Sequence, residues 1–135
     1  MNRNMNTGTK KRFTLIELLI AVVVLAVLLT TAVAAYDGIM KKTRRAEARE
    51  ALSEVAARQE QFFLDNKRYA TTAAQLGVLT TTENAYYTLA IDAQPPLLPM
   101  GYTITATAIN AQANDTLCLN LVIRSNGSRI PDACW

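Results

Sequence analysis

Residues 13–36 read FTLIELLIAVVVLAVLLTTAVAAY, a stretch that is apolar or small throughout except for one carboxylate. A helix needs about 20 predominantly apolar residues to cross a bilayer, whereas the apolar part of a cleaved signal peptide usually has about 7 to 15. This stretch is long enough for a membrane-spanning helix and too long for the apolar part of a signal peptide. The sequence therefore predicts that residues 13–36 form a transmembrane helix.

Glu17 is the carboxylate within this apolar stretch. An unpaired acid near the start of a membrane helix costs a few kcal/mol if it lies in hydrocarbon, so it must reach the headgroups or meet a cation. Both interpretations are open from this residue alone.

The residues before the apolar stretch form a basic leader, 1–12, that carries four cations and no acid: Arg3, Lys10, Lys11 and Arg12. Positive charge ahead of a membrane helix keeps the N-terminus cytoplasmic and sends the C-terminal part across the membrane. The whole chain has a net charge of +3, so residues 13–135 sum to 3 − 4 = −1. The sequence pI of about 9.0 therefore comes from the leader and does not indicate a nucleic-acid-binding domain.

The hexapeptide FTLIEL at residues 13–18, preceded by the basic KKR, closely resembles the N-terminal signature of type IV pilins and related prepilins. The resemblance implies that a peptidase cuts the leader between Arg12 and Phe13 and that the new amine of Phe13 is methylated. It also implies that Glu17, with Thr14 in the same assembly motif, neutralises this amine in a neighbouring subunit of a filament. The family has Gly immediately before the Phe, and Arg12 departs from that pattern.

The resemblance also implies partners and location. The expected partners are other pilin subunits, the prepilin peptidase, the inner-membrane pilus assembly machinery and, before assembly, membrane lipid. The expected location is a single pass in the bacterial inner membrane with a cytoplasmic N-terminus, followed by an extracellular pilus. Residues 32–70 and the final Cys134-Trp135 resemble minor pilins of the PilE type in particular.

Residues 37–68 continue the helical pattern without a proline and are rich in good helix formers. An apolar stripe at helical spacing predicts a face that packs on a core; its members are Leu52, Val55, Ala56, Gln59, Phe62 and Phe63. On the charged side, Glu54 and Arg58 form an i, i+4 pair in the favourable order. Four cations that follow the apolar stretch could meet headgroups or neighbouring subunits: Lys41, Lys42, Arg44 and Arg45. Gly38 is the candidate for local unwinding.

Residues 69–135 are predicted to form a connecting loop and then an antiparallel sheet, with a short helical turn over 72–76. Period-two or apolar segments bounded by turn residues indicate strands at 86–91, 102–109 and 117–124, with a return at 129–135. Four residues are expected to share the face that packs on the helical stripe: Leu117, Leu119, Leu121 and Ile123. The fold class is α+β, a long N-terminal helix whose second half packs against a three- to four-stranded antiparallel sheet, as the pilin resemblance implies.

Cys118 and Cys134 are the two cysteines of the chain, so they allow one pairing. If the C-terminal part crosses the membrane, they lie where disulfides persist. The bond would close a loop of about 16 residues and stabilise the fold by roughly 3 kcal/mol. Two free thiols are the alternative. The resemblance to pilins, whose C-terminal loop is bounded by a disulfide, favours the bond.

No catalytic residue set is present, because the chain has no histidine and Ser125 and Ser128 have no activating partner. Neither a metal site nor a cofactor is indicated. We therefore expect a structural subunit of a type IV pilus, a minor pilin, and not an enzyme. Three alternatives stay open: a DNA-uptake pilin, a type II secretion pseudopilin, and an exported protein cleaved after Ala34. Nucleic acid is disfavoured as a partner because residues 69–135 contain two cations, Arg124 and Arg129.

Overall fold

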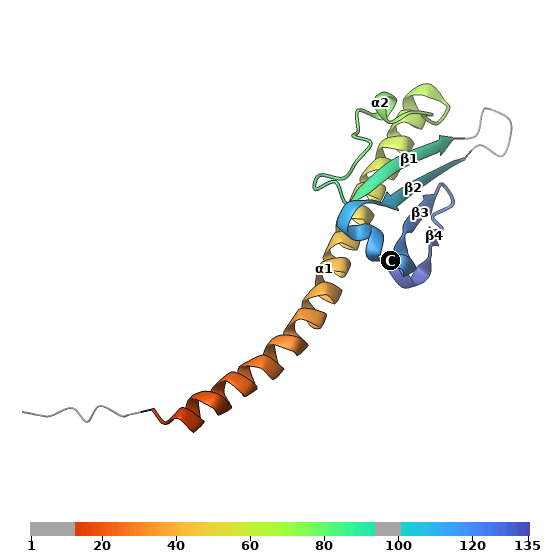
Figure 1. The fold of residues 1–135 in the computed structure, drawn as a ribbon. Coiled ribbons are helices and arrows are strands. Elements are labelled where there is room, and N and C mark those ends of the chain that lie inside the picture. The colour runs from red at the N-terminus through yellow and green to blue at the C-terminus, as the bar shows by residue number, and fades with distance from the viewer. Residues whose placement is uncertain (1–12, 94–100) are drawn as a thin grey trace, which may run out of the picture. The chain divides into compact units, whose positions relative to one another are not determined.

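The computed structural model describes residues 13–93 and 101–135, with the backbone alone for 31–35. Its helices and strands are α1 (Leu15–Asn66), α2 (Ala73–Leu76), β1 (Tyr87–Ala93), β2 (Tyr102–Ala108), β3 (Asn120–Arg124) and β4 (Arg129–Ile130) (Figure 1). Short 3₁₀ helices lie at Asn110–Asn114, Thr116–Cys118 and Asp132–Cys134. The chain divides into two compact units between Asp37 and Gly38. We call the second unit, residues 38–135, the head.

Helix α1 begins directly after Thr14, which caps it. The backbone N–H of Glu17 donates to Thr14 Oγ1 at 3.3 Å, and the N–H of Leu18 donates to the Thr14 carbonyl at 3.2 Å. Gly38 lies inside α1, so the expected weak point does not end the helix. In the described part of the chain, no helix meets the length and apolarity that a membrane span requires.

The four strands form one antiparallel sheet in the order β1-β2-β3-β4, which confirms the predicted sheet. Ile91 pairs with Ile104, and Ile104 pairs with Ile123, so one residue of each long strand lies in the same row. Along β2 the buried side chains alternate with partly exposed ones, as expected for a sheet with one covered face.

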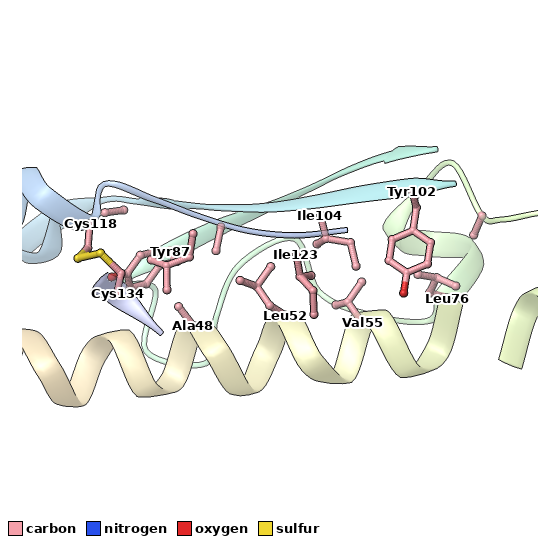
Figure 2. Packing of buried hydrophobic residues seen from close by; sticks show 14 residues of the cluster. Ala48, Leu52, Val55, Leu76, Tyr87, Tyr102, Ile104, Cys118, Ile123 and Cys134 are labelled. Atoms are coloured by element: carbon pink, nitrogen blue, oxygen red, sulfur yellow. A yellow bond between two sulfur atoms is a disulfide. The ribbon is translucent and has the colours of Figure 1, made fainter. Parts of the chain in front are cut away.

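The core lies between the sheet and the head part of α1 (Figure 2). Leu52 and Ile104 are fully buried, and Val55 is 2% exposed. The predicted packing of Leu121 and Ile123 against the helical stripe is confirmed, because all belong to one buried cluster. Burying side chains of this size contributes about 1.5–3 kcal/mol each.

The prediction for Leu117 and Leu119 was wrong. Leu117 is 84% exposed and Leu119 37% exposed. The chain reaches β3 through 3₁₀ turns, so the period-two alternation begins only at Asn120 and Cys118 takes the inward position instead. Cys118 therefore lies in a 3₁₀ helix before β3 and not in the strand itself.

A buried polar cluster fastens these turns to α1. Both oxygens of Asp115 accept hydrogen bonds from Arg45, each at 2.6 Å, and Gln112 Nε2 donates to Asp115 at 2.8 Å and to the Tyr87 hydroxyl at 3.0 Å. The bond with Asp115 raises the pKa of Arg45 above its ordinary value. Arg44 lies over the Tyr86 ring, 4.6 Å from its centre. Both arginines therefore contact their own head, and contacts of the four cations with headgroups or neighbouring subunits stay a prediction.

The predicted disulfide between Cys118 and Cys134 is present (Figure 2). It ties the 3₁₀ turn before β3 to the C-terminal 3₁₀ helix, and both cysteines are buried. Another predicted contact, the pair of Glu54 and Arg58 on α1, is also present at 2.8 Å.

Replacing Asp115 by Ala should destabilise the head by about 2–4 kcal/mol, because Arg45 would keep its charge with no carboxylate beside it. Denaturant unfolding of the full chain in detergent, followed by the fluorescence of Trp135, measures the loss. Asp92→Ala, which removes an exposed acid, serves as the control and should change stability by less than about 0.5 kcal/mol. Equal stabilities of the two variants would contradict a structural role for the buried pair.

Replacing both cysteines by Ser should cost about 3 kcal/mol, because the C-terminal loop is no longer closed in the unfolded chain. Limited proteolysis should then cut between residues 118 and 134, and the steady-state amount of the subunit should fall. The control is the unaltered protein under the same protease without reductant. Unchanged protease resistance of this loop would contradict the prediction.

Candidate functional site

Residues 13–29 present an apolar surface interrupted by Glu17. Every large apolar side chain from Phe13 to Leu29 exposes between 52% and 82% of its surface. A stretch of this kind gains about 1.5–3 kcal/mol for each side chain that another molecule covers. Isolated in water it would aggregate, so it must be covered by lipid or by other apolar helices.

The predicted assembly residues lie at the start of this surface. Thr14 precedes α1 and caps it. Glu17 occupies the third helical position, where a carboxylate is stabilised by the positive end of the helix dipole. Phe13 is 78% exposed and lies outside the helix. Arg12 lies outside the described residues. Within the described part of the chain, no cation pairs with the Glu17 carboxylate.

Sequence reasoning missed the capping role of Thr14. Its signal was the Thr-x-x-Glu spacing from residue 14 to 17, which is the sequence of a capping box. The helix is therefore given a defined start two residues after Phe13, and Glu17 is fixed within its first turn.

The head carries an acidic groove of about 510 Å³ between α1 and the segment at 77–83. Four glutamates line it together with apolar side chains that include Val55, Val78 and Leu89: Glu47, Glu50, Glu54 and Glu83. Three of these acids recur at 47, 50 and 54, a helical spacing from which the sequence could have shown a shared face.

Glu47 holds the most constrained carboxylate of this groove. Its two oxygens accept hydrogen bonds from the backbone and side-chain N–H groups of Asn84, both at 3.0 Å. Burial by itself would raise the pKa of Glu47, but the hydrogen bonds from Asn84 outweigh it and the pKa is lowered. The carboxylate is therefore ionised at neutral pH.

Three exposed cations that follow α1 or end β3 are together called the basic end: Lys67, Arg68 and Arg124. Tyr102 joins them, because its ring contacts Tyr69 at 4.9 Å between centres and its carbonyl accepts the N–H of Ser125 at 3.0 Å. Burial and the neighbouring Glu60 raise the pKa of Tyr102, so its hydroxyl stays neutral.

The described residues include no group of three or more His, Cys, Asp or Glu side chains placed to hold a metal ion. The arrangement instead offers contact surfaces: an apolar helix, an acidic groove and a basic end. Surfaces of these kinds bind other macromolecules or lipid.

Comparison with known proteins identifies the fold and the family. A type IV pilin from Shewanella oneidensis, whose structure is known at high resolution, is similar to this chain. The TM-score is 0.54, and the sequences are 24% identical over 70% of this chain and 97% of that one. This likeness shows the pilin fold. No curated protein matches the sequence.

The family model described as "Type IV minor pilin ComP, DNA uptake sequence receptor" matches residues 34–122. The match begins after the FTLIEL motif, so it supports the pilin interpretation independently of that motif. Nothing in these comparisons supports a secretion pseudopilin or an exported protein cleaved after Ala34. Since the match covers well over half of the sequence, the chain belongs to this family of type IV minor pilins and is a structural subunit of a type IV pilus.

Proposed function

We propose that residues 13–36 hold the subunit in the inner membrane before assembly and join the filament core afterwards. The proposal is supported above all by the exposure of every large apolar side chain from Phe13 to Leu29. The basic leader orients such a segment with its N-terminus in the cytoplasm. The inner-membrane assembly machinery would then transfer the helix from lipid to the apolar helices of other pilin subunits. This structural role requires no catalysis and no cofactor.

The proposal includes processing by a prepilin peptidase between Arg12 and Phe13 and methylation of the Phe13 amine. A positive amine at that position would lie two residues from the positive end of α1, which is unfavourable. The carboxylate of Glu17 lowers the cost of that positive charge. In the filament, the Glu17 carboxylate neutralises the Phe13 amine of a neighbouring subunit. An amine buried in an apolar filament core without a carboxylate would cost several kcal/mol.

Glu17→Ala and Glu17→Val should leave membrane insertion intact and lower incorporation into pili at least about tenfold, since about 1.4 kcal/mol of lost pairing corresponds to a factor of ten. Immunoblots of membrane and sheared-pilus fractions from the native host measure both quantities. Glu17→Asp, which keeps the charge, is the matched control and should retain most incorporation.

Thr14→Val separates the helix cap from the charge, because it removes the hydroxyl that accepts the N–H of Glu17. The loss of a cap costs about 1 kcal/mol, so we expect a smaller effect than for Glu17→Ala. Normal incorporation of both the Ala and Val variants of Glu17 would contradict the charge-neutralising role.

A second function is favoured by the family description, which names a DNA uptake sequence receptor. We propose that the basic end, Lys67, Arg68 and Arg124, contacts the phosphates of duplex DNA. These three side chains are exposed and positively charged. Arg68 follows α1 and Arg124 ends β3, and Tyr102 contacts the neighbour of each, because its ring packs on Tyr69 and its carbonyl bonds to Ser125. Nucleic acid was disfavoured as a partner because residues 69–135 contain only two cations, but that range omits Lys67 and Arg68.

The full chain in detergent should shift duplex DNA in a gel at low salt, and Lys67→Glu with Arg68→Glu should weaken that binding. Each lost phosphate contact should lower the slope of log affinity against log salt by about 0.9. Lys42→Glu with Lys41→Glu reverses the same number of charges elsewhere on α1 and should have little effect. Absence of binding at low salt, or equal losses in the two double variants, would exclude the basic end as the DNA site.

A further inference from the structure

The first turns of α1 within the head lie beside the 3₁₀ turns that precede β3. Arg44 donates to the Ala111 carbonyl at 3.5 Å, and Arg45 forms its ion pair with Asp115. These contacts join two segments that are far apart in the sequence into one continuous part of the surface of the head: residues 38–46 and residues 109–119.

This part of the head carries positive charge and exposes no acid. Residues 38–46 contain four cations and no acid: Lys41, Lys42, Arg44 and Arg45. The one acid of residues 109–119 is Asp115, which is 4% exposed and paired with Arg45. Asp37, directly before the first segment, leaves a sum of 4 − 1 = +3 for residues 37–46. We call residues 38–46 and 109–119 together the acid-free surface.

Two large apolar side chains of the acid-free surface are exposed. Leu117 is 84% exposed and Ile39 is 61% exposed. Leu117 lies in the 3₁₀ helix Thr116–Cys118, and the disulfide from Cys118 to Cys134 anchors that turn to the head. Cations combined with exposed apolar side chains are the composition with which protein segments bind the surface of anionic membranes.

We propose that, before assembly, the acid-free surface rests on the non-cytoplasmic leaflet of the inner membrane and binds the headgroups of anionic lipid. This proposal rests on the proposed function, which places residues 13–36 in that membrane. Tyr36 ends the predicted span and precedes Lys41 by five residues. Five helical residues rise about 7.5 Å, and a headgroup layer is about 5 to 8 Å thick. The length of chain after the span therefore leaves these cations within reach of the headgroups.

The acids of α1 follow its cations at a distance. Glu50 and Glu54 come 9 and 13 residues after Lys41, which corresponds to about 14 and 20 Å of helix. The screening length in physiological salt is about 8 Å, so the repulsion of these acids by an anionic leaflet is largely screened. Glu47 is nearer to the cations, and Asn84 holds its carboxylate by two hydrogen bonds. The charge distribution along α1 thus favours one orientation of the head, with residues 41–45 toward the lipid.

The contact orients the head and is not the anchor of the chain. Each Lys or Arg near an anionic surface raises the affinity for that surface about fivefold. Because the span already holds the chain in the bilayer, the contact is intramolecular, and a few such cations are sufficient to populate it. The contact breaks when the helix passes from lipid into the filament, so it belongs to the stored subunit alone.

Photo-cross-linking in nanodiscs tests this contact with the full chain. Leu117→p-benzoylphenylalanine places the cross-linker on the acid-free surface and keeps every cation. Irradiation in nanodiscs that contain phosphatidylglycerol should attach lipid to residue 117 at least about threefold more than in nanodiscs of phosphatidylcholine alone, as mass spectrometry measures. The control is Leu79→p-benzoylphenylalanine, which is similarly exposed at 73%, lies at the acidic groove and should capture little lipid in either disc.

Charge variants on the Leu117→p-benzoylphenylalanine background test the role of the cations. Lys41→Glu with Lys42→Glu should lower the adduct in phosphatidylglycerol discs at least about threefold, because attraction becomes repulsion. Lys67→Glu with Arg68→Glu reverses the same number of charges after the end of α1 and should leave the adduct unchanged. A rise in salt from about 0.1 M to about 1 M shortens the screening length from about 10 Å to about 3 Å and should lower the adduct without any charge substitution.

Four results overturn the proposal: equal adducts at residues 117 and 79, equal adducts in the two kinds of disc, an adduct that salt does not change, or an adduct with a second copy of the chain in place of lipid. Retention of the chain in the disc is measured in parallel by size-exclusion chromatography. A chain that stays in the disc without a lipid adduct at residue 117 shows that the head contact alone fails. A chain that does not enter the disc contradicts the membrane role of residues 13–36, and this proposal with it.

Discussion

The head depends on the stripe of α1 that covers the buried face of the sheet. A sheet of four antiparallel strands exposes one apolar face unless another element packs on it. Ala48, Leu52 and Val55 supply that covering surface within a single helix. Because β1, β2 and β3 all place buried residues in the same cluster, any loss of this stripe uncovers the whole face at once. The helix is thus the common partner of every strand in the core.

Apolar packing alone does not hold the irregular segments of the head in place. Two sets of buried polar contacts, here called clamps, do so. Arg45 and Asp115 fasten the turns before β3 to α1. Gln59, which is fully buried, donates to the Ala70 carbonyl at 2.8 Å and accepts from the Ala70 N–H at 2.9 Å, so it holds the chain that leaves α1. Buried polar groups left without such partners would cost about 1–3 kcal/mol each, so both clamps also specify one arrangement of the loops.

The helix, the sheet and the disulfide could be predicted from the sequence. The helical spacing of Leu52 and Val55 indicated the buried stripe, and alternation indicated β2. The two cysteines allow one pairing. Prediction failed where a distant contact overrides the local pattern. Leu117 and Leu119 alternate with Leu121, yet the clamp at Asp115 and the disulfide hold their segment in 3₁₀ turns. Asp115, the partner of Arg45, is 70 residues away in the sequence, so no local pattern predicts this ion pair. The spacing of the acids at 47, 50 and 54 could have indicated one side of the acidic groove, but Glu83 joins them only through the fold.

Net charge is a poor guide to the contacts of this subunit, because the leader contributes +4 and the rest of the chain only −1. A processed subunit would be almost neutral, and a nearly neutral surface neither repels its neighbours nor draws them by long-range attraction. What remains is the distribution of charge, with four glutamates in the acidic groove and exposed arginines at Arg124 and Arg129. Apolar helices can slide and rotate against each other with little change in buried area. They therefore drive the association of subunits but do not fix the relative orientation of the subunits. Polar contacts between heads are directional, so they can fix the orientation that the apolar helices leave open.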